Sequence, residues 1–165
     1  MTASNEKVKK IGWREWLAMP GIGIPAIKAK IDTGAKTSAL HAFKLEPFTH
    51  DGKEHIRFWI HPLQRNTDLG IICEAPVYDR RTIRDSGGHE EERFVIKTRV
   101  VLCEDEWPIE ISLTSRENMS FRMLLGRSAI KRKNFLIDPE ISYSCGRKLW
   151  RVYGRKKNKS KGGKK

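Results

Sequence analysis

The feature that most constrains the fold is a run of alternating residues that ends in an aspartate. In residues 27–31, apolar and charged side chains take turns, and this period of two is typical of a strand with one buried face. Asp32-Thr33-Gly34 follows directly, so a carboxylate stands where the strand gives way to a turn. Such an aspartate is either an ordinary turn residue or a catalytic acid.

Short runs of the same kind recur along the chain and are separated by turn residues. No stretch has the spacing of an amphipathic helix of ordinary length, although residues 128–133 are predicted to form one or two helical turns. Many short strands with turns between them indicate an all-β barrel or sandwich. The predicted strands are residues 13–19, 24–31, 39–45, 54–60, 71–83, 93–102, 107–113, 122–125 and 135–137.

The loop over residues 84–92 has the composition of a hairpin turn. It contains Ser86-Gly87-Gly88 between two predicted strands, and glycine supplies the positive φ that tight turns require. Over a cleft, such a hairpin would act as a mobile flap. On a plain surface it would have no part in binding, and the sequence leaves both interpretations open.

Length, cysteine content and the lack of long apolar runs limit the class of protein. A chain of 165 residues suits one domain with its own core. Cys73, Cys103 and Cys145 are odd in number and far apart, which predicts unpaired thiols and a reducing compartment. No signal-peptide pattern is visible, and no apolar run approaches the ~18 residues of a membrane helix. We therefore expect a cytoplasmic protein without membrane contact.

Positive charge is concentrated at the C-terminus. The net charge is +13, and residues 155–165 contain seven of the 33 Lys and Arg residues and no acidic residue. We expect a flexible N-terminus over residues 1–10, a domain over 11–150 and a disordered basic tail over 151–165. The tail is predicted either to contact nucleic acid or a ribosome, or simply to keep the chain in solution.

The histidines, cysteines and glycines form no recognisable metal or phosphate motif. None of the five histidines belongs to an HExxH sequence, and no cysteine pair has zinc-finger spacing. The pattern GxxxxGK[ST] of a phosphate-binding loop is also missing. We therefore predict no metal ligand and no cofactor.

Asp32-Thr33-Gly34 has a chemical interpretation as well as a structural one. A turn after a buried strand raises the Asp32 carboxylate into a cleft, Gly34 permits close approach of the backbone, and the Thr33 hydroxyl can bond to the turn. Two such carboxylates held close together share one proton, so one acts on water as a base while the other acts as an acid. The tripeptide alone is a weak signal, because it usually marks an ordinary turn.

A second motif, Leu124-Leu125-Gly126-Arg127, strengthens the catalytic interpretation. Together with residues 31–35 it resembles the pattern of retropepsin-like aspartic peptidases. Over residues 11–145 the chain resembles one bacterial family of this type, labelled ATP-dependent zinc protease or RimK/LysX-associated zinc peptidase-like. The segments that carry this resemblance are GWREW at residues 12–16, IPAIKAK at 24–30, HPLQ at 61–64 and FRMLLGR at 121–127.

The resemblance implies a closed retropepsin-like (acid protease) barrel, all-β with one short helix near the C-terminus. It gives Asp32 the catalytic role, with Thr33 and Gly34 shaping the turn and Gly126 packed beneath it. Lys36 and Arg127 flank this site, where they either bind acidic side chains or balance charge. The residues expected to meet substrate are Ala35, Lys36, Gly87, Gly88 and Arg127.

The resemblance also implies an activity and partners. Only one Asp-Thr-Gly is present, so a peptidase would need a homodimer to bring two copies of Asp32 together. Members of the family occur beside ATP-grasp glutamate ligases, which implies a ligase partner and a glutamate-tailed ribosomal protein as the peptide substrate. Two alternatives stay open: a non-catalytic module that binds a peptide or a ligase, and a zinc-dependent peptidase, as the family label states.

Overall fold

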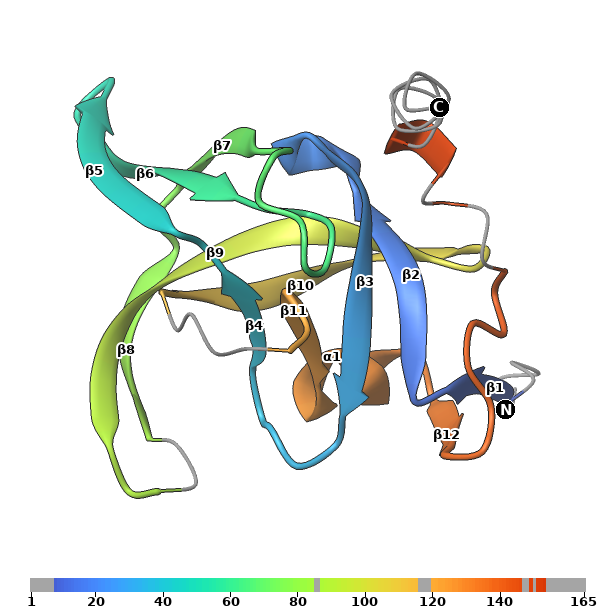
Figure 1. Cartoon of the computed structure of the whole chain (residues 1–165). Helices are drawn as coiled ribbons and strands as arrows, with labels where there is room; N and C mark the ends of the chain where they lie inside the picture. Colours follow the sequence, from blue (N-terminus) through green and yellow to red (C-terminus); the bar gives the residue numbers. More distant parts are fainter. Residues whose placement is uncertain (1–7, 85–86, 116–119, 147–148, 150, 154–165) are drawn as a thin grey trace, which may run out of the picture.

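The described part of the chain consists mostly of β-strands (Figure 1). The computed structural model describes residues 8–84, 87–115, 120–146, 149 and 151–153. Two short helical segments accompany the strands, η1 (Pro20–Ile22) and α1 (Arg127–Arg132). The strands are β1 (Lys9–Gly12), β2 (Arg14–Met19), β3 (Ile24–Asp32), β4 (Ser38–His41), β5 (Lys44–His50), β6 (Lys53–Ile60), β7 (Ile71–Pro76), β8 (Asp79–Arg84), β9 (Glu90–Leu102), β10 (Asp105–Thr114), β11 (Met123–Gly126) and β12 (Phe135–Asp138).

The largest sheet closes into a ring. Its strand order is β10-β4-β11-β3-β2-β9-β8, and β10 also pairs with β9, so six strands form a continuous circuit while β8 extends from it. The prediction of a mostly β fold with one short helix, α1, is thus confirmed. The strands of the ring contribute most of the buried apolar side chains that form the core.

β3 shows how the alternating sequence builds this core. Ile27, Ala29 and Ile31 are buried, whereas Lys28 and Asp32 are half-buried. Burying an isoleucine side chain stabilises a fold by about 1.5–3 kcal/mol, so the register of β3 is strongly fixed. A slip of one residue would bring the charged side chains into the core.

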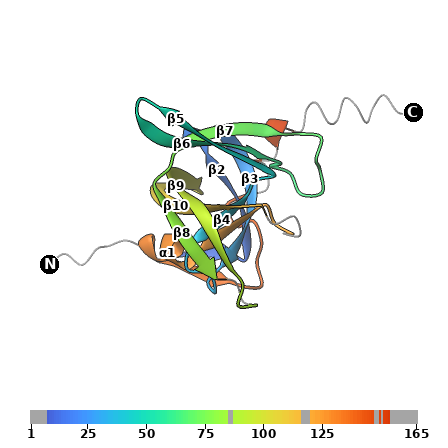
Figure 2. The same cartoon turned by 90° about the vertical axis from the view of Figure 1, so that its left-hand side faces the viewer.

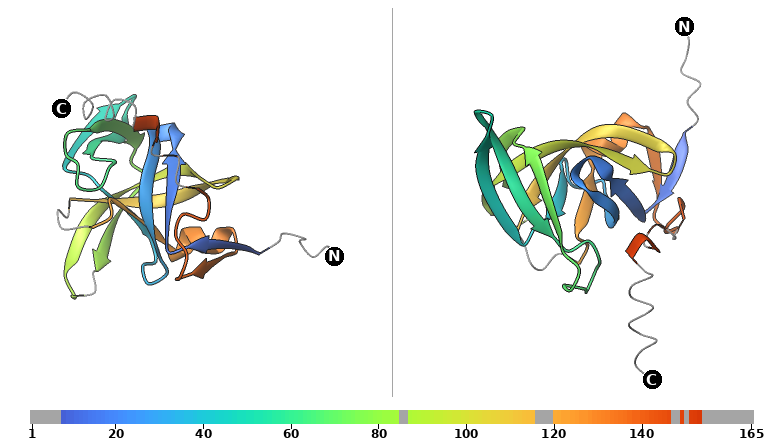
Figure 3. Two further views of the ribbon diagram at one scale, coloured as in Figure 1. Left: turned by 45° about the vertical axis from the view of Figure 1, so that its right-hand side comes forward. Right: turned by 90° about the horizontal axis from the view of Figure 1, so that it is seen from above.

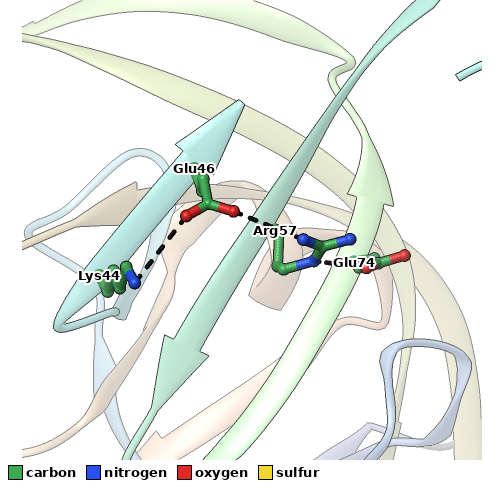
Figure 4. Close-up of polar contacts among 4 residues, drawn as sticks. All are labelled: Lys44, Glu46, Arg57 and Glu74. Carbon is green, nitrogen blue, oxygen red and sulfur yellow. Dashed lines mark hydrogen bonds and ion pairs between the residues drawn. The ribbon is translucent and has the colours of Figure 1, made fainter. Parts of the chain in front are cut away.

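A second sheet of three strands, β5-β6-β7, lies over one side of the ring, at the top of Figure 2. Its exposed face carries a row of charges drawn in Figure 4, in which Glu46, Arg57 and Glu74 are direct partners on adjacent strands. Arg57 Nε lies 2.6 Å from a Glu74 oxygen, and Arg57 Nη1 lies 3.4 Å from a Glu46 oxygen. The hydrogen bond and charge of Glu74 raise the pKa of Arg57. Opposite charges on facing strands support the register of this sheet.

The strand predictions at residues 39–45 and 71–83 are wrong in one respect, because each segment forms two strands. Ala42 N–H donates to Thr114 O in the ring, and Phe43 N–H donates to Trp59 O in the three-stranded sheet. Likewise, β7 lies in the three-stranded sheet and β8 in the seven-stranded sheet. Each break occurs where the chain crosses between sheets, which periodicity does not reveal. β1 is a further strand that was not predicted.

The cysteine prediction is also wrong for two of the three residues. Cys103 and Cys145 form a disulfide with a Cα–Cα distance of 4.9 Å, because the β9–β10 turn meets the segment after β12. Cys73 is free and buried, and burial raises its pKa to about 12. Wide spacing in the sequence therefore did not prevent two cysteines from meeting in space.

The segment after β12 is fixed by a buried carboxylate. Glu15 is fully buried, and it accepts hydrogen bonds from the N–H groups of Gly12 (2.6 Å), Ser144 (3.0 Å) and Cys145 (3.2 Å). β12 also pairs in parallel with β1. Figure 3 shows this pair beside α1. The strand β1 includes Lys9 and Lys10, which were expected to be flexible, whereas residues 1–7 and 154–165 lie outside the described residues.

Candidate active site

Asp32 is the last residue of β3, and its carboxylate lies where the strand passes into a tight turn. Gly34 N–H donates a hydrogen bond to Asp32 Oδ1 (3.0 Å), and Ala35 N–H donates to the Asp32 carbonyl oxygen (3.3 Å). Asp32 is half-buried, whereas Thr33 and Gly34 are exposed. The turn therefore orients the carboxylate and leaves it open to solvent on one side.

Gly126 supports this turn from below. β11 runs parallel to β3 and places Gly126 opposite Asp32. A Cβ atom at Gly126 would lie 2.6 Å from Thr37 C and 2.8 Å from Ser38 N, which is too close for any side chain. Gly126 N–H also donates to Ser38 Oγ (2.9 Å). These contacts explain why an apolar strand that ends in glycine accompanies the aspartate turn.

Arg127 and Ser128, at the start of α1, form hydrogen bonds to the backbone of the loop that follows Asp32. Arg127 N–H donates to Ala35 O (2.7 Å), and Ser128 N–H donates to Lys36 O (3.0 Å). The Arg127 guanidinium donates to Thr33 O (2.8 Å). Arg127 thus has a partner in its own chain, and Thr33 contributes its carbonyl group rather than its hydroxyl to the turn.

A cleft of about 520 Å³ lies beside the turn, between β8, β10 and α1; we call it the β8–α1 cleft. Glu110 lines it and lies 2.7 Å from the Arg81 guanidinium. Arg81 also bonds to Asp79, and the bonds to Asp79 and Glu110 raise the pKa of Arg81. The cations that line the cleft are Lys36, Arg81, Lys97 and Arg132. Of these, only Lys36 was predicted from the sequence, because folding brings the other three to the cleft from separate elements.

The β8–β9 hairpin projects from the same side of the molecule as the Asp32 turn (Figures 1 and 3). Its last described pair is Arg84 with Glu90, whose side chains lie 3.2 Å apart. Gly88 has a φ of +84°, a conformation that glycine adopts at little cost. Residues 85–86 lie outside the described residues. A hairpin was predicted here, and β8 lines the β8–α1 cleft through Arg81, Thr82 and Ile83.

The described residues contain no group of three or more His, Cys, Asp and Glu side chains that could hold a metal ion. His41 is buried in β4 and has no such group around it. Within the same residues, no helix is long and apolar enough to cross a membrane.

Comparison with known proteins identifies a matching family and several relatives of this chain. The family described as "RimB-like: Retropepsin-like aspartic endopeptidase RimB" matches residues 10–148. A protein of Parasynechococcus marenigrum (strain WH8102), named "Probable alpha-L-glutamate ligase", is 47% identical over 136 residues, which cover 82% of this chain and 29% of the relative. A protein of Shewanella pealeana with the same name is 42% identical over 156 residues, which cover 92% of this chain and 34% of the relative. The chain thus spans about a third of the length of these curated relatives.

A solved structure has the same fold. It is the crystal structure of a protein with unknown function from Legionella pneumophila, which superposes with a TM-score of 0.70. The match covers 84% of this chain and 99% of that chain at 23% sequence identity. The two proteins therefore share an arrangement of strands, and this likeness says nothing about their activities.

Proposed function

The chain belongs to the RimB-like family of retropepsin-like aspartic endopeptidases, and we propose that it hydrolyses peptide bonds as a homodimer. The observation that carries this proposal is the Asp32 turn, in which Gly34 orients the carboxylate and Gly126 leaves space for the loop. The sequence has one Asp-Thr-Gly, so the second carboxylate comes from the Asp32 of another copy. Asp32 and the exposed Thr33 lie where β3 passes into the loop, and a two-fold contact between two copies of this loop can bring the two carboxylates together.

The two Asp32 carboxylates would hold one proton between them, because two negative charges at short distance repel. The ionised carboxylate takes a proton from water as the water oxygen bonds to the peptide carbonyl carbon. The protonated carboxyl group gives its proton to the carbonyl oxygen. The C–N bond then breaks as the first carboxyl group gives the proton it took from water to the amide nitrogen. The second carboxylate takes a proton back from one hydroxyl of the tetrahedral intermediate, which leaves a new carboxyl group and a new amine.

We propose that the substrate is acidic. Lys36, Arg81, Lys97 and Arg132 line the β8–α1 cleft beside the Asp32 turn, with Glu110 as the carboxylate among its lining residues. Such a cleft favours carboxylate side chains. The relatives are named for glutamate ligation, which supports a glutamate-tailed peptide or ribosomal protein as substrate and a ligase as partner. Gly87 and Gly88 would allow the β8–β9 hairpin to bend over a bound peptide.

The test is a mass measurement on a peptide that ends in several glutamates. Wild-type protein should shorten it, and Asp32→Asn should lose the activity by at least a hundredfold while keeping the circular dichroism spectrum of the wild type. Asp51→Asn is the matched control, because it makes the same chemical change in the exposed β5–β6 turn. Full activity of Asp32→Asn would rule out the aspartic mechanism.

Two other outcomes separate the alternatives. Activity that survives Asp32→Asn but is lost with a chelator would assign a zinc-dependent peptidase. Binding of the peptide without any cleavage would assign a binding module, a role that the ligase names of the longer relatives favour.

A further inference from the structure

A second cleft, of about 670 Å³, lies on the outer face of β2 and β3; we call it the β2–β3 cleft. Four separate segments contribute to its lining, namely the start of β2, the middle of β3, the loop after β6 and the residues before β11. Its volume is in the range of small-molecule sites, about 300–1,000 Å³. The lining residues that matter here are Trp13, Arg14, Lys28, Gln64, Arg65 and Arg122.

The charge of this cleft is not compensated by the protein. No carboxylate is among its lining residues, and none of its four cations pairs with a carboxylate in the described part of the chain. Other arginines of the sheets do have carboxylate partners. Those that pair with Glu or Asp are Arg57, Arg80, Arg81, Arg84, Arg93 and Arg99. Four like charges around one concave site repel one another, and an anionic ligand would remove that cost.

Aromatic rings fix two of the cations in advance. The Arg14 guanidinium lies 4.7 Å from the centre of the Trp13 ring and 4.9 Å from that of Tyr143. Lys28 Nζ lies 5.5 Å from the Tyr143 ring and 5.6 Å from the Trp16 ring. Because the protein's own cations use these rings, the cleft offers a ligand oriented N–H donors more than open ring faces. This arrangement favours an oxyanion over a stacked base.

Arg122 supplies an independent indication of a ligand. Its Nε is buried and has no hydrogen-bond partner among the described residues. A buried N–H without an acceptor is costly to the fold. Arg122 lines the cleft, so a shift of its side chain towards an oxyanion bound there would give this N–H an acceptor. The backbone of Arg122 is fixed, because its carbonyl oxygen accepts a hydrogen bond from His41 N–H (2.8 Å).

We propose that the β2–β3 cleft binds an oligophosphate chain, either free or carried on a nucleotide. One peptide carboxylate would balance one of the four cations, whereas a triphosphate carries three to four negative charges in one compact group, about as many as the cleft presents. Three of the cations are arginines, whose planar forks match phosphate oxygens in pairs. The β8–α1 cleft differs because Glu110 offsets part of its charge.

The cleft also has a relation to the candidate active site. Lys28 and Asp32 lie on the same face of β3, because residues two and four positions apart along a strand point the same way. Their separation of four residues corresponds to about 13 Å. A bound phosphate chain would therefore lie along the approach to Asp32, although the proposal does not depend on peptidase activity.

The test is calorimetric titration of the full chain with sodium tripolyphosphate at about 0.15 M salt, where non-specific attraction is screened. We expect one site per chain, and Arg14→Gln and Arg122→Gln should each weaken binding by about tenfold or more, the loss expected for one charge-assisted hydrogen bond. Lys28→Gln is a further variant if either arginine change disturbs folding. Lys53→Gln, an exposed lysine of β6, is the control and should change affinity less than twofold.

Parallel titrations identify the source of the phosphate. Equal affinity for ATP and tripolyphosphate would assign the site to the phosphate chain alone, and tighter ATP binding would add contacts to the nucleoside. Asp32→Asn should bind tripolyphosphate like wild type, which separates this proposal from the proposed peptidase. Three outcomes would overturn it: no binding by wild type, equal weakening by Lys53→Gln, or tighter binding of a hexaglutamate peptide through the same arginines.

Discussion

At the Asp32 turn, the close approach of two backbone segments decides which residue type can occupy position 126. β11 comes so near to Thr37 and Ser38 that Gly126 has no space for a Cβ atom. The neighbouring atoms belong to the backbone and cannot rotate away. The same contact that excludes a side chain lets Gly126 N–H reach Ser38 Oγ, so the glycine positions the loop that carries Asp32.

Replacing Gly126 with alanine should therefore destabilise the protein and displace the turn. We expect a loss of about 1–3 kcal/mol in the free energy of unfolding, the usual cost of inserting a methyl group into a packed site. Urea unfolding measures this loss. Gly52→Ala provides a comparison, since nothing lies within 4 Å of a Cβ there and only its positive φ is strained. A smaller loss for Gly126→Ala than for Gly52→Ala would contradict the steric argument.

At the scale of elements, the end of the described chain is anchored by one hydroxyl group. Tyr153 OH donates to Ala26 O (2.6 Å) and accepts from Ala26 N–H (3.2 Å), which fixes residues 151–153 against β3. Burial raises the pKa of Tyr153 from 10.0 to about 12. The folded protein therefore holds this proton more firmly than the unfolded chain does.

This difference predicts a dependence on pH. The stabilisation from Tyr153 should be complete below pH 10 and should be lost as the pH rises towards about 12. Tyr153→Phe lacks the hydroxyl, so its stability deficit relative to wild type should shrink between pH 9 and pH 11. Urea midpoints of both proteins at the two pH values test this, because other titrating groups cancel in the difference. A constant deficit would show that the proton is not involved.

At the scale of the whole molecule, the disulfide joins two regions that are far apart in the sequence. Cys103 lies in the β9–β10 turn and Cys145 follows β12, with a sequence separation of 42 residues. Closing a loop of this size restricts the unfolded chain. The bond also secures the segment that packs on Glu15.

The double variant Cys103→Ser with Cys145→Ser should lower the free energy of unfolding by about 3–4 kcal/mol, as estimated for a loop of this size. Urea unfolding of wild type with a thiol reductant should give the same loss. Thiol titration of the denatured, unreduced chain should find one free thiol, from Cys73. Three free thiols would mean that the pair is not formed in the isolated protein.

The proposed homodimer makes a prediction at the same scale. If each active site needs two copies of Asp32, a ninefold excess of Asp32→Asn should reduce the activity per wild-type chain to roughly one tenth after subunit exchange, because random pairing gives most wild-type chains an inactive partner. Peptide cleavage at a fixed amount of wild type measures this. Unchanged activity per wild-type chain would show that one copy of Asp32 suffices.

Much of this fold could be predicted because its signals are local. The alternation that ends at Asp32 fixed the face and the length of β3 to within one residue, and α1 begins one residue before the predicted start. Local signals did not show where residues 39–45 and 71–83 pass from one sheet to another. The break in each segment depends on hydrogen bonds to distant strands.

The sequence by itself determined the β-rich architecture, the aspartate turn and its glycine partner, because periodicity and backbone space act within a few residues. Only the tertiary structure decided that Cys103 meets Cys145, that Lys36 shares a cleft with Arg81 and Arg132, and that Arg14 shares another with Arg122. Covalent pairing and charge clustering depend on distances between remote segments. Those distances are set when the ring of strands closes, and the closing depends on pairings between strands that are far apart in the sequence.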